Sequence, residues 1–260
     1  CAWPIPSPAS AQNVVPVGAE SSSIERPPVA VSVEDFAWMR GRFETATPQE
    51  NAVWTELKQW ADRCLATRTL EAGAALRAAK VEPVALPVSD YGQPECALVQ
   101  AADSVAGYFA SWDAFERSLA EASPYFQGYR LAAEAAEETA DGLRGDLPMA
   151  LMMLTIGEQT LRKGLGSNIE GSHPLTMSDG ARRLFDLMVW HEVKQRDLEN
   201  SAILARLLDA RGWPGISAVG QKASQSAWLV IQHADDNPAL QLKALTLMEA
   251  APEGEVDRSN

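Results

Sequence analysis

The chain has 260 residues, of which 46% are hydrophobic and 22% charged, a composition typical of a compact globular protein and not of a disordered one. Its net charge of -13 opposes binding to nucleic acid or to anionic lipid, because both require clustered Lys and Arg. No uninterrupted run of about 18 to 20 apolar residues is present, so no membrane-spanning segment is predicted.

Residues 1–31 are rich in Pro and Ser and predict an extended tether. The first residue is Cys1, and a cysteine ahead of such a tether resembles the lipidated N-terminus of a mature bacterial lipoprotein. The alternatives are cleavage of an ordinary signal peptide after Ala9-Ser10-Ala11 and an arbitrary boundary of the sequence. We therefore expect a periplasmic or outer-membrane-anchored protein, touching a membrane only through a lipid on Cys1, with secretion as the alternative.

Two further cysteines agree with such a compartment. Cys64 lies on an apolar helical stripe with Leu57 and Ala61, and Cys96 begins the next helical segment, so a bridge between neighbouring helices is predicted. The alternative is a pair of buried free thiols that pack as small hydrophobic groups. Two cysteines without closely spaced partners are too few for a structural zinc site.

The middle of the chain is helical almost throughout. Helices are predicted to begin after Ser32 and after Thr47, because each precedes capping and first-turn residues. Apolar spacing then predicts one long helix from about residue 95 to 115, and Ser123-Pro124 is expected to start another. The glycine and proline between 142 and 148 predict a boundary, which divides a helical region at 32–146 from a C-terminal helical domain at 147–260.

The second half of the chain continues the helical pattern. Helices are predicted over 149–165, 178–211, 217–234 and 238–250, and Gly212 with Pro214 ends the longest of them. No window alternates in the manner of a convincing strand. The predicted fold is all-α, a multi-helix bundle-like array that follows the tether.

Three of these helices carry polar residues on otherwise apolar faces. Glu158 and Arg162 are four residues apart near the core, and the long helix places Asp197 and Asn200 beside buried positions. Buried polar groups require partners, so these side chains are predicted to meet. The predicted cluster contains Gln159, Arg162, Asp197, Asn200, Gln232, His233 and Asp235.

Such a cluster has a functional and a structural interpretation. In a site, Asp197 or Asp235 orients His233 as a general base, Arg162 or Arg196 binds an anion, and a neighbouring amide holds a neutral group. In a structural network, the same groups fix how the helices pack, and an imidazolium is favourable near a helix C-terminus.

Metal chemistry is not predicted. His191-Glu192 begins like the helical zinc-protease motif, but Gln195 stands where the second histidine is needed. His233 with Asp235 offers two donors, which are too few for a metal ion. No metal and no other cofactor is expected.

Several elements in the second half resemble a bacterial family that is defined by a domain of unknown function. They occur in a fixed order: Gln159-x-x-Arg162, Asp197-x-x-Asn200, Gly212-Trp213-Pro214, Val219-Gly220, and Gln232-His233-Ala234-Asp235 with Gln241. The resemblance covers about residues 149–256, adds Trp213 to the candidate ligand-binding residues, and implies no reaction. Family members continue into an Asp-Arg pair and a closing Tyr-Gly-Thr-Gln, so a site that needs that segment is expected to be incomplete here.

Three functional hypotheses follow. The leading one is a helical protein that binds a protein partner or a small ligand through the cluster around His233. The second is a hydrolase or transferase with His233 as general base and Asp197 or Asp235 beside it. The third is a structural accessory subunit of an envelope complex, anchored by tryptophans. These are Trp3, Trp38, Trp54, Trp60, Trp112, Trp190, Trp213 and Trp228.

Overall fold

The computed structural model describes residues 26–81, 94–143, 145–165 and 175–257. The all-α prediction is confirmed, and these residues contain no strand. None of the described helices is long and apolar enough to cross a bilayer. In chain order the elements are the 3-10 helix η2 (Ala37–Arg42), then α1 (Pro48–Ala78), α2 (Pro94–Ala106), α3 (Trp112–Leu143), α4 (Leu147–Leu154), α5 (Ile156–Leu165), α6 (Asp179–Arg211), α7 (Ile216–Val219), α8 (Gln221–Gln232) and α9 (Pro238–Glu249).

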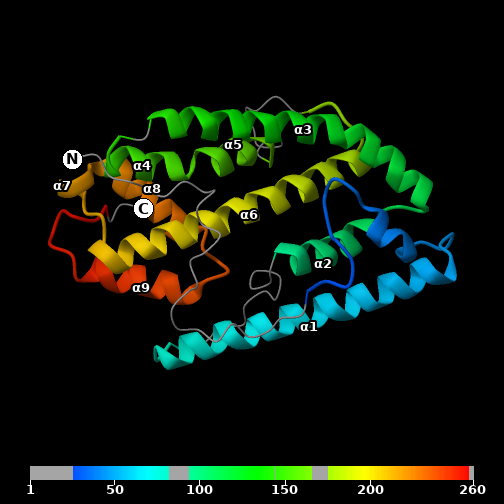
Figure 1. The fold of residues 1–260 in the computed structure, drawn as a ribbon, viewed down its shortest axis with the longest axis horizontal. Helices are drawn as coiled ribbons and strands as arrows, with labels where there is room; N and C mark the ends of the chain where they lie inside the picture. Colours follow the sequence, from blue (N-terminus) through cyan, green and yellow to red (C-terminus); the bar gives the residue numbers. More distant parts are fainter. Residues whose placement is uncertain (1–25, 82–93, 144, 166–174, 258–260) are drawn as a thin grey trace.

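Helix α6 runs through the middle of the molecule, with α3 and α5 on one side of it and α1 and α2 on the other (Figure 1). It also contacts α8 and α9. Its ends match the prediction: Ser178 accepts a hydrogen bond from the backbone of Ala181, and Gly212 ends the helix at a positive φ of 73°. The left-handed conformation at Gly212 costs least for glycine, which explains the stop.

The other predicted helix starts were partly correct. Thr47 caps α1 in a reciprocal arrangement with Glu50, as its sequence indicates. The helix predicted over 95–115 instead breaks after Ala106, and Pro124 lies inside α3 instead of starting a new helix. One buried face continues across Pro124 through Phe115, Ala122, Phe126 and Ala133, and this packing outweighs the hydrogen bond that proline removes.

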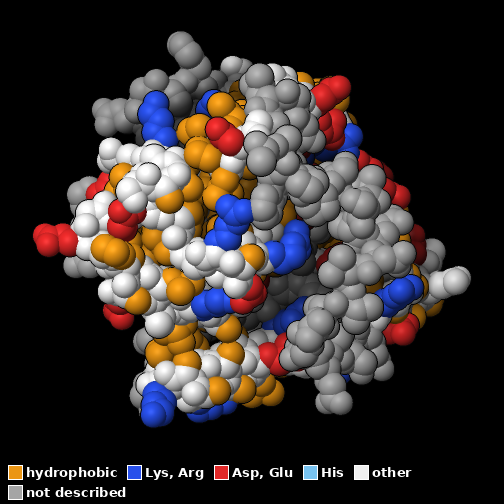
Figure 2. All heavy atoms as spheres, turned by 60° about the vertical axis from the view of Figure 1, so that its left-hand side comes forward, with side chains coloured by type: hydrophobic (Ala, Val, Ile, Leu, Met, Phe, Trp, Pro, Cys, Tyr) orange, Lys and Arg blue, Asp and Glu red, His pale blue; other side chains and the backbone are white. Residues whose placement is uncertain are grey.

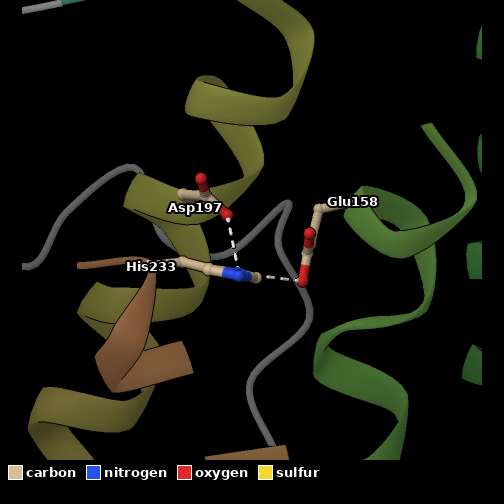
Figure 3. Close-up of side chains that lie close together, drawn as sticks. All are labelled: Glu158, Asp197 and His233. Carbon is tan, nitrogen blue, oxygen red and sulfur yellow. Dashed lines mark ion pairs between the residues drawn. The ribbon is translucent and has the colours of Figure 1, made fainter. Parts of the chain in front are cut away.

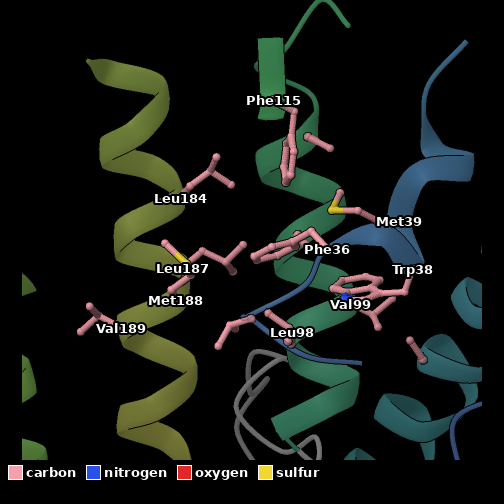
Figure 4. Close-up of a cluster of buried hydrophobic side chains, with 14 of the residues drawn as sticks. Phe36, Trp38, Met39, Leu98, Val99, Phe115, Leu184, Leu187, Met188 and Val189 are labelled. Atoms are coloured by element: carbon pink, nitrogen blue, oxygen red, sulfur yellow. The ribbon is translucent and has the colours of Figure 1, made fainter. Parts of the chain in front are cut away.

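The larger hydrophobic core lies among η2, α1, α2, α3 and the N-terminal half of α6 (Figure 4). Its aromatic centre includes Phe36 and Phe115, whose rings meet edge to face with centroids 5.6 Å apart. Helix α5 adds Leu161, and Val193 is the last residue that α6 contributes.

A second core lies between α4, the C-terminal half of α6, and α7 to α9. Leu151 of α4 and Leu204 of α6 belong to it, and both are buried. Because α5 and the first half of α6 complete the first core, the two cores do not divide at the predicted boundary between 146 and 147. Whether the predicted regions fold independently stays a prediction.

The predicted bridge between Cys64 and Cys96 is present as a disulfide, with Cα atoms 6.3 Å apart. It joins α1 to the first turn of α2 inside the larger core, where both side chains are buried. Of the predicted tether 1–31, residues 1–25 and hence Cys1 lie outside the described residues. Val29 and Val31 pack against the larger core, so the packed body begins before the predicted limit of the tether.

The molecular surface agrees with the composition. Figure 2 shows Lys and Arg side chains scattered among acidic and apolar ones on the face it presents, without a continuous basic patch.

Candidate functional site

Three polar side chains from three helices meet where the two hydrophobic cores join (Figure 3). Asp197 lies on α6 between Val193 of the larger core and Leu204 of the smaller one. Glu158 comes from the first turn of α5, and His233 is the residue that ends α8. The cluster therefore occupies the seam between the two cores.

The imidazole of His233 lies beside both carboxylates. Its Nδ1 is 3.3 Å from Oε1 of Glu158 and 3.7 Å from Oδ1 of Asp197. This nitrogen is fully buried and makes no hydrogen bond of acceptable geometry with any described residue. The side chain as a whole is 18% exposed, so part of it remains accessible from outside.

Arg162 joins the two carboxylates from the other side. Its Nε donates to Oε2 of Glu158 at 2.5 Å and its Nη2 donates to Oδ2 of Asp197 at 2.9 Å. Gln159 donates to Oε1 of Glu158 at 3.0 Å. The indole of Trp190, 45% exposed, lies 5.3 Å from the guanidinium carbon of Arg162 and covers it.

Burial sets the electrostatics of the acid pair. Glu158 is 1% exposed and Asp197 is 3% exposed. Burial raises the pKa of Asp197 to about 6; Arg162 opposes this rise and the neighbouring Glu158 adds to it. Burial also opposes ionisation of Glu158, but His233 beside it and the hydrogen bonds from Gln159 and Arg162 outweigh burial and lower its pKa.

Local structure explains how His233 reaches the acids. It is the C-cap of α8, with φ -88° and ψ -2°, and its N–H still bonds to the carbonyl of Leu229 at 3.1 Å. Gln241 of α9 donates to the carbonyl of Ile231 at 3.1 Å and so holds the last turn of α8. The imidazole is therefore presented from a helix end that is fixed by a neighbouring helix.

Not every predicted residue joins the cluster. Gln232 is exposed and Asp235 pairs with Lys194 at 3.3 Å, away from His233. Trp213 packs against the smaller core, and its indole nitrogen is buried without a hydrogen-bond partner among the described residues. Asn200 is partly buried one turn beyond Asp197.

The predicted anion-binding role does not fit either arginine. Arg162 donates from Nε to Glu158 and from Nη2 to Asp197. Arg196 donates to Glu137 of α3 at 2.8 Å and to Glu192 at 2.7 Å. Each guanidinium already faces two carboxylates, so neither presents an uncompensated positive charge to an anion.

Glu158 is the residue whose importance the sequence understated. The sequence predicts it as the partner of Arg162, and it offers only His233 and Asp235 as neighbouring metal donors. The structure replaces Asp235 with Glu158 and Asp197, so three donor groups now lie within 4.8 Å of one another. The sequence feature that points to a buried Glu158 is its four-residue spacing from Arg162 on an apolar stripe.

The last described turn of the chain packs against the short helix α7. Glu255 accepts a hydrogen bond from the backbone N–H of Ser217 at 3.0 Å, and its own carbonyl accepts one from Ile216 at 3.1 Å. This ties the last described turn of the chain to the segment that follows Pro214. A Cβ on Gly215 would overlap the Glu255 carboxylate, which would have to move away from Ser217 to admit it.

The tryptophans do not gather on the described surface. Trp38, Trp54, Trp60 and Trp112 are buried in the larger core, and Trp190 is the exposed one among the described tryptophans. Trp3 lies outside the described residues.

Comparison of the chain with family models, with curated proteins and with solved structures gives no match. The family resemblance therefore stays a prediction.

Proposed function

We propose that this protein works outside the cytoplasm, where it binds a small cationic ligand at the cluster of Glu158, Asp197, His233 and Arg162. One observation carries the proposal: two carboxylates that are 1% and 3% exposed share one arginine, and each directs a second oxygen toward the unbonded Nδ1 of His233. An ionised carboxylate is costly to bury unless a positive charge or several hydrogen bonds compensate it.

The charges of the cluster favour a cation over an anion. Two ionised carboxylates and one guanidinium leave one negative charge inside the seam, and it faces His233. A proton or a bound cation neutralises that charge, whereas an anion adds to it. The partly exposed ring of His233 marks the side from which a small ligand enters.

The proposed compartment is supported by the disulfide between Cys64 and Cys96, since such bonds persist in oxidising environments. Anchoring through Cys1 is part of the same proposal. Cell fractionation with mass spectrometry of the N-terminal peptide tests both. A diacylated Cys1 peptide in the membrane fraction supports the anchor, and an unmodified peptide in the cytoplasm contradicts the proposal.

Ligand binding is tested by thermal unfolding of the full chain with a panel of small cations: divalent metal ions, a polyamine and free arginine. We expect at least one of them to raise the midpoint of the parent, because a ligand that binds only the folded state stabilises it. Glu158→Gln should abolish the rise. Glu192→Gln, which changes the same kind of ion pair at Arg196, should preserve it. A parent that responds to none of these cations contradicts the proposal.

A hydrolase or transferase is the second candidate, and the position of His233 favours it. Carboxylates beside Nδ1 orient an imidazole so that its other nitrogen takes a proton from water or a hydroxyl group. This candidate predicts that His233→Ala abolishes an activity found by substrate screening, while Lys194→Ala, at the nearby pair with Asp235, does not.

A further inference from the structure

We propose that Glu158, Asp197 and His233 coordinate a divalent transition-metal ion, and that Zn²⁺ is the ion their geometry fits best. The inference rests on the proposed function, because it names the cation that the cluster binds. It revises the sequence-based expectation that no metal site is present.

The distances from Nδ1 of His233 to the two carboxylates are close to those between neighbouring ligands of a metal ion. Zn²⁺ binds nitrogen and oxygen ligands at about 2.0 to 2.2 Å, so neighbouring ligands of a tetrahedral ion lie about 3.4 Å apart. Nδ1 of His233 is 3.3 Å from Glu158 and 3.7 Å from Asp197, and one donor from each of the three groups lies within 4.8 Å of the others. Small side-chain shifts therefore suffice to place one ion between them.

The unbonded nitrogen is the second argument. Nδ1 of His233 is buried and faces two carboxylate oxygens, which are acceptors. A bare lone pair in that position is repelled by both carboxylates, so a proton or a metal ion belongs between them. A metal ion bound to all three groups also removes the uncompensated negative charge.

The remaining oxygens of both carboxylates are held in the manner of metal ligands. Arg162 bonds to Oε2 of Glu158 and to Oδ2 of Asp197, which leaves the oxygens nearest His233 for the ion. Gln159 donates to Oε1 of Glu158, and a carboxylate oxygen has a second lone pair for a metal. Partners of this kind fix ligand orientation and raise metal affinity.

The donor set selects the class of ion. Ca²⁺ and Mg²⁺ favour ligand sets made wholly of oxygen, whereas an imidazole with two carboxylates suits Zn²⁺ and neighbouring transition metals. Three protein ligands leave a fourth position for water or substrate, which is the arrangement of a catalytic zinc site and not of a closed structural one. The partly exposed side of His233 is where that position opens.

Isothermal titration of Zn²⁺ into the chelator-treated full chain tests the inference. All proteins carry Cys1→Ser, so that a free thiol does not bind zinc. We expect one ion per chain in the parent and in Glu192→Gln. Gln159→Ala, which removes an orienting hydrogen bond, should weaken binding about 10-fold. Asp197→Asn and His233→Gln, which remove ligands, should each weaken it by more than about 100-fold, beyond the loss for an orienting residue.

A second measurement does not depend on the folding of any variant. The imidazole nitrogens of the parent, which has three histidines, are followed by NMR during the Zn²⁺ titration. A shift of Nδ1 of His233 at one equivalent supports the site. Absence of zinc binding, or binding that leaves His233 unshifted, overturns it.

The outcomes also separate this inference from the proposed function. If Zn²⁺ does not bind but a polyamine or free arginine stabilises the parent in a Glu158-dependent way, the metal site is wrong and cation binding stands. If no cation binds, both are wrong, and a proton between Nδ1 and the carboxylates takes the place of the ion.

Discussion

Two arginines in this protein make the same pattern of contacts in different surroundings. Arg162 pairs with Glu158 four residues earlier on its own helix and with Asp197 across the helix interface. Arg196 pairs in the same way with Glu192 and, across the interface, with Glu137. The carboxylates around Arg162 are 1% and 3% exposed, whereas those around Arg196 are 20% and 39% exposed.

The two networks have the same number of ion pairs and differ in the burial of their carboxylates, and this burial distinguishes the candidate site. Water screens Glu137 and Glu192, so Arg196 with its two partners forms an ordinary interhelical bridge. Glu158 and Asp197 lack that screening, and they alone have a third helix that brings an imidazole. Variants of the Arg196 network are therefore matched controls for variants of the Arg162 network.

The largest expected effect is that of Arg162→Ala. Removing this arginine leaves two buried carboxylates without their shared cation, and we expect a loss of about 3 to 5 kcal/mol in the free energy of unfolding. Arg196→Ala should cost about 1 kcal/mol, because its partners are partly exposed to solvent. Urea unfolding of both metal-free variants measures the difference. Equal losses would show that burial does not distinguish the two networks.

The next effect is a pH dependence to which Asp197 of the buried network makes the largest expected contribution. Folding raises the pKa of Asp197 from 3.8 to about 6, so the folded state binds more protons than the unfolded state between these values. The free energy of unfolding therefore falls as pH rises through this window, by at most about 3 kcal/mol, and is level above it. Glu158, whose pKa is lowered, acts in the opposite direction below its ordinary value of 4.5.

Urea midpoints of metal-free parent and Asp197→Asn between about pH 4.5 and 7 test this assignment. The variant should show a clearly smaller fall. A residual slope is expected from Asp186 and Glu199, because burial raises the pKa of both. An unchanged slope in the variant would mean that Asp197 is not the titrating group.

The same two networks show how far sequence reasoning reached. Local signals placed the long helix α6 correctly, because Ser178 and Gly212 mark its ends in the sequence itself. The periodicity of apolar residues also indicated that Arg162 and Asp197 point inward. It indicated the same for Arg196, which at 14% exposed is more buried than Arg162 at 21%, but the partners Glu137 and Glu192 stay 39% and 20% exposed. Spacing along one helix identifies a face but does not reveal how completely the neighbouring helices cover it.

The sequence names Asp197 and Asp235 as alternative partners of His233 and does not decide between them, for a related cause. Asp235 is close to His233 in the sequence, but α8 ends at His233 and the following residues leave the helical path. Asp235 consequently turns to Lys194, and the acids that meet the imidazole come from α5 and α6. Which acids contact the imidazole is determined by how α5, α6 and α8 pack at the seam between the two cores, and the sequence does not show this packing.

A smaller effect is expected where α9 supports the third helix of the buried network. Gln241→Ala removes the hydrogen bond to the carbonyl of Ile231 and should cost about 1 kcal/mol. Amide hydrogen exchange at His233 and Ala234 should become faster, since the last turn of α8 loses its support. Gln225→Ala, which breaks the contact of the same helix with Asp257, should leave exchange at those two residues unchanged. Equal exchange in both variants would show that Gln241 does not position His233.

The smallest expected effect tests whether the two networks are coupled. A Cβ on Gly157 would overlap the side chain of Glu137, which belongs to the Arg196 network, yet Gly157 directly precedes Glu158. The end of Glu137 is flexible and 39% exposed, so in Gly157→Ala it moves aside at little cost, and the better helix propensity of alanine offsets part of that cost. We expect a change in unfolding free energy within about 0.5 kcal/mol and unaltered cation binding. A weakened cation response would instead mean that Glu137, by packing on the first turn of α5, also sets the position of Glu158, and the two arginine networks would then have to be treated as one.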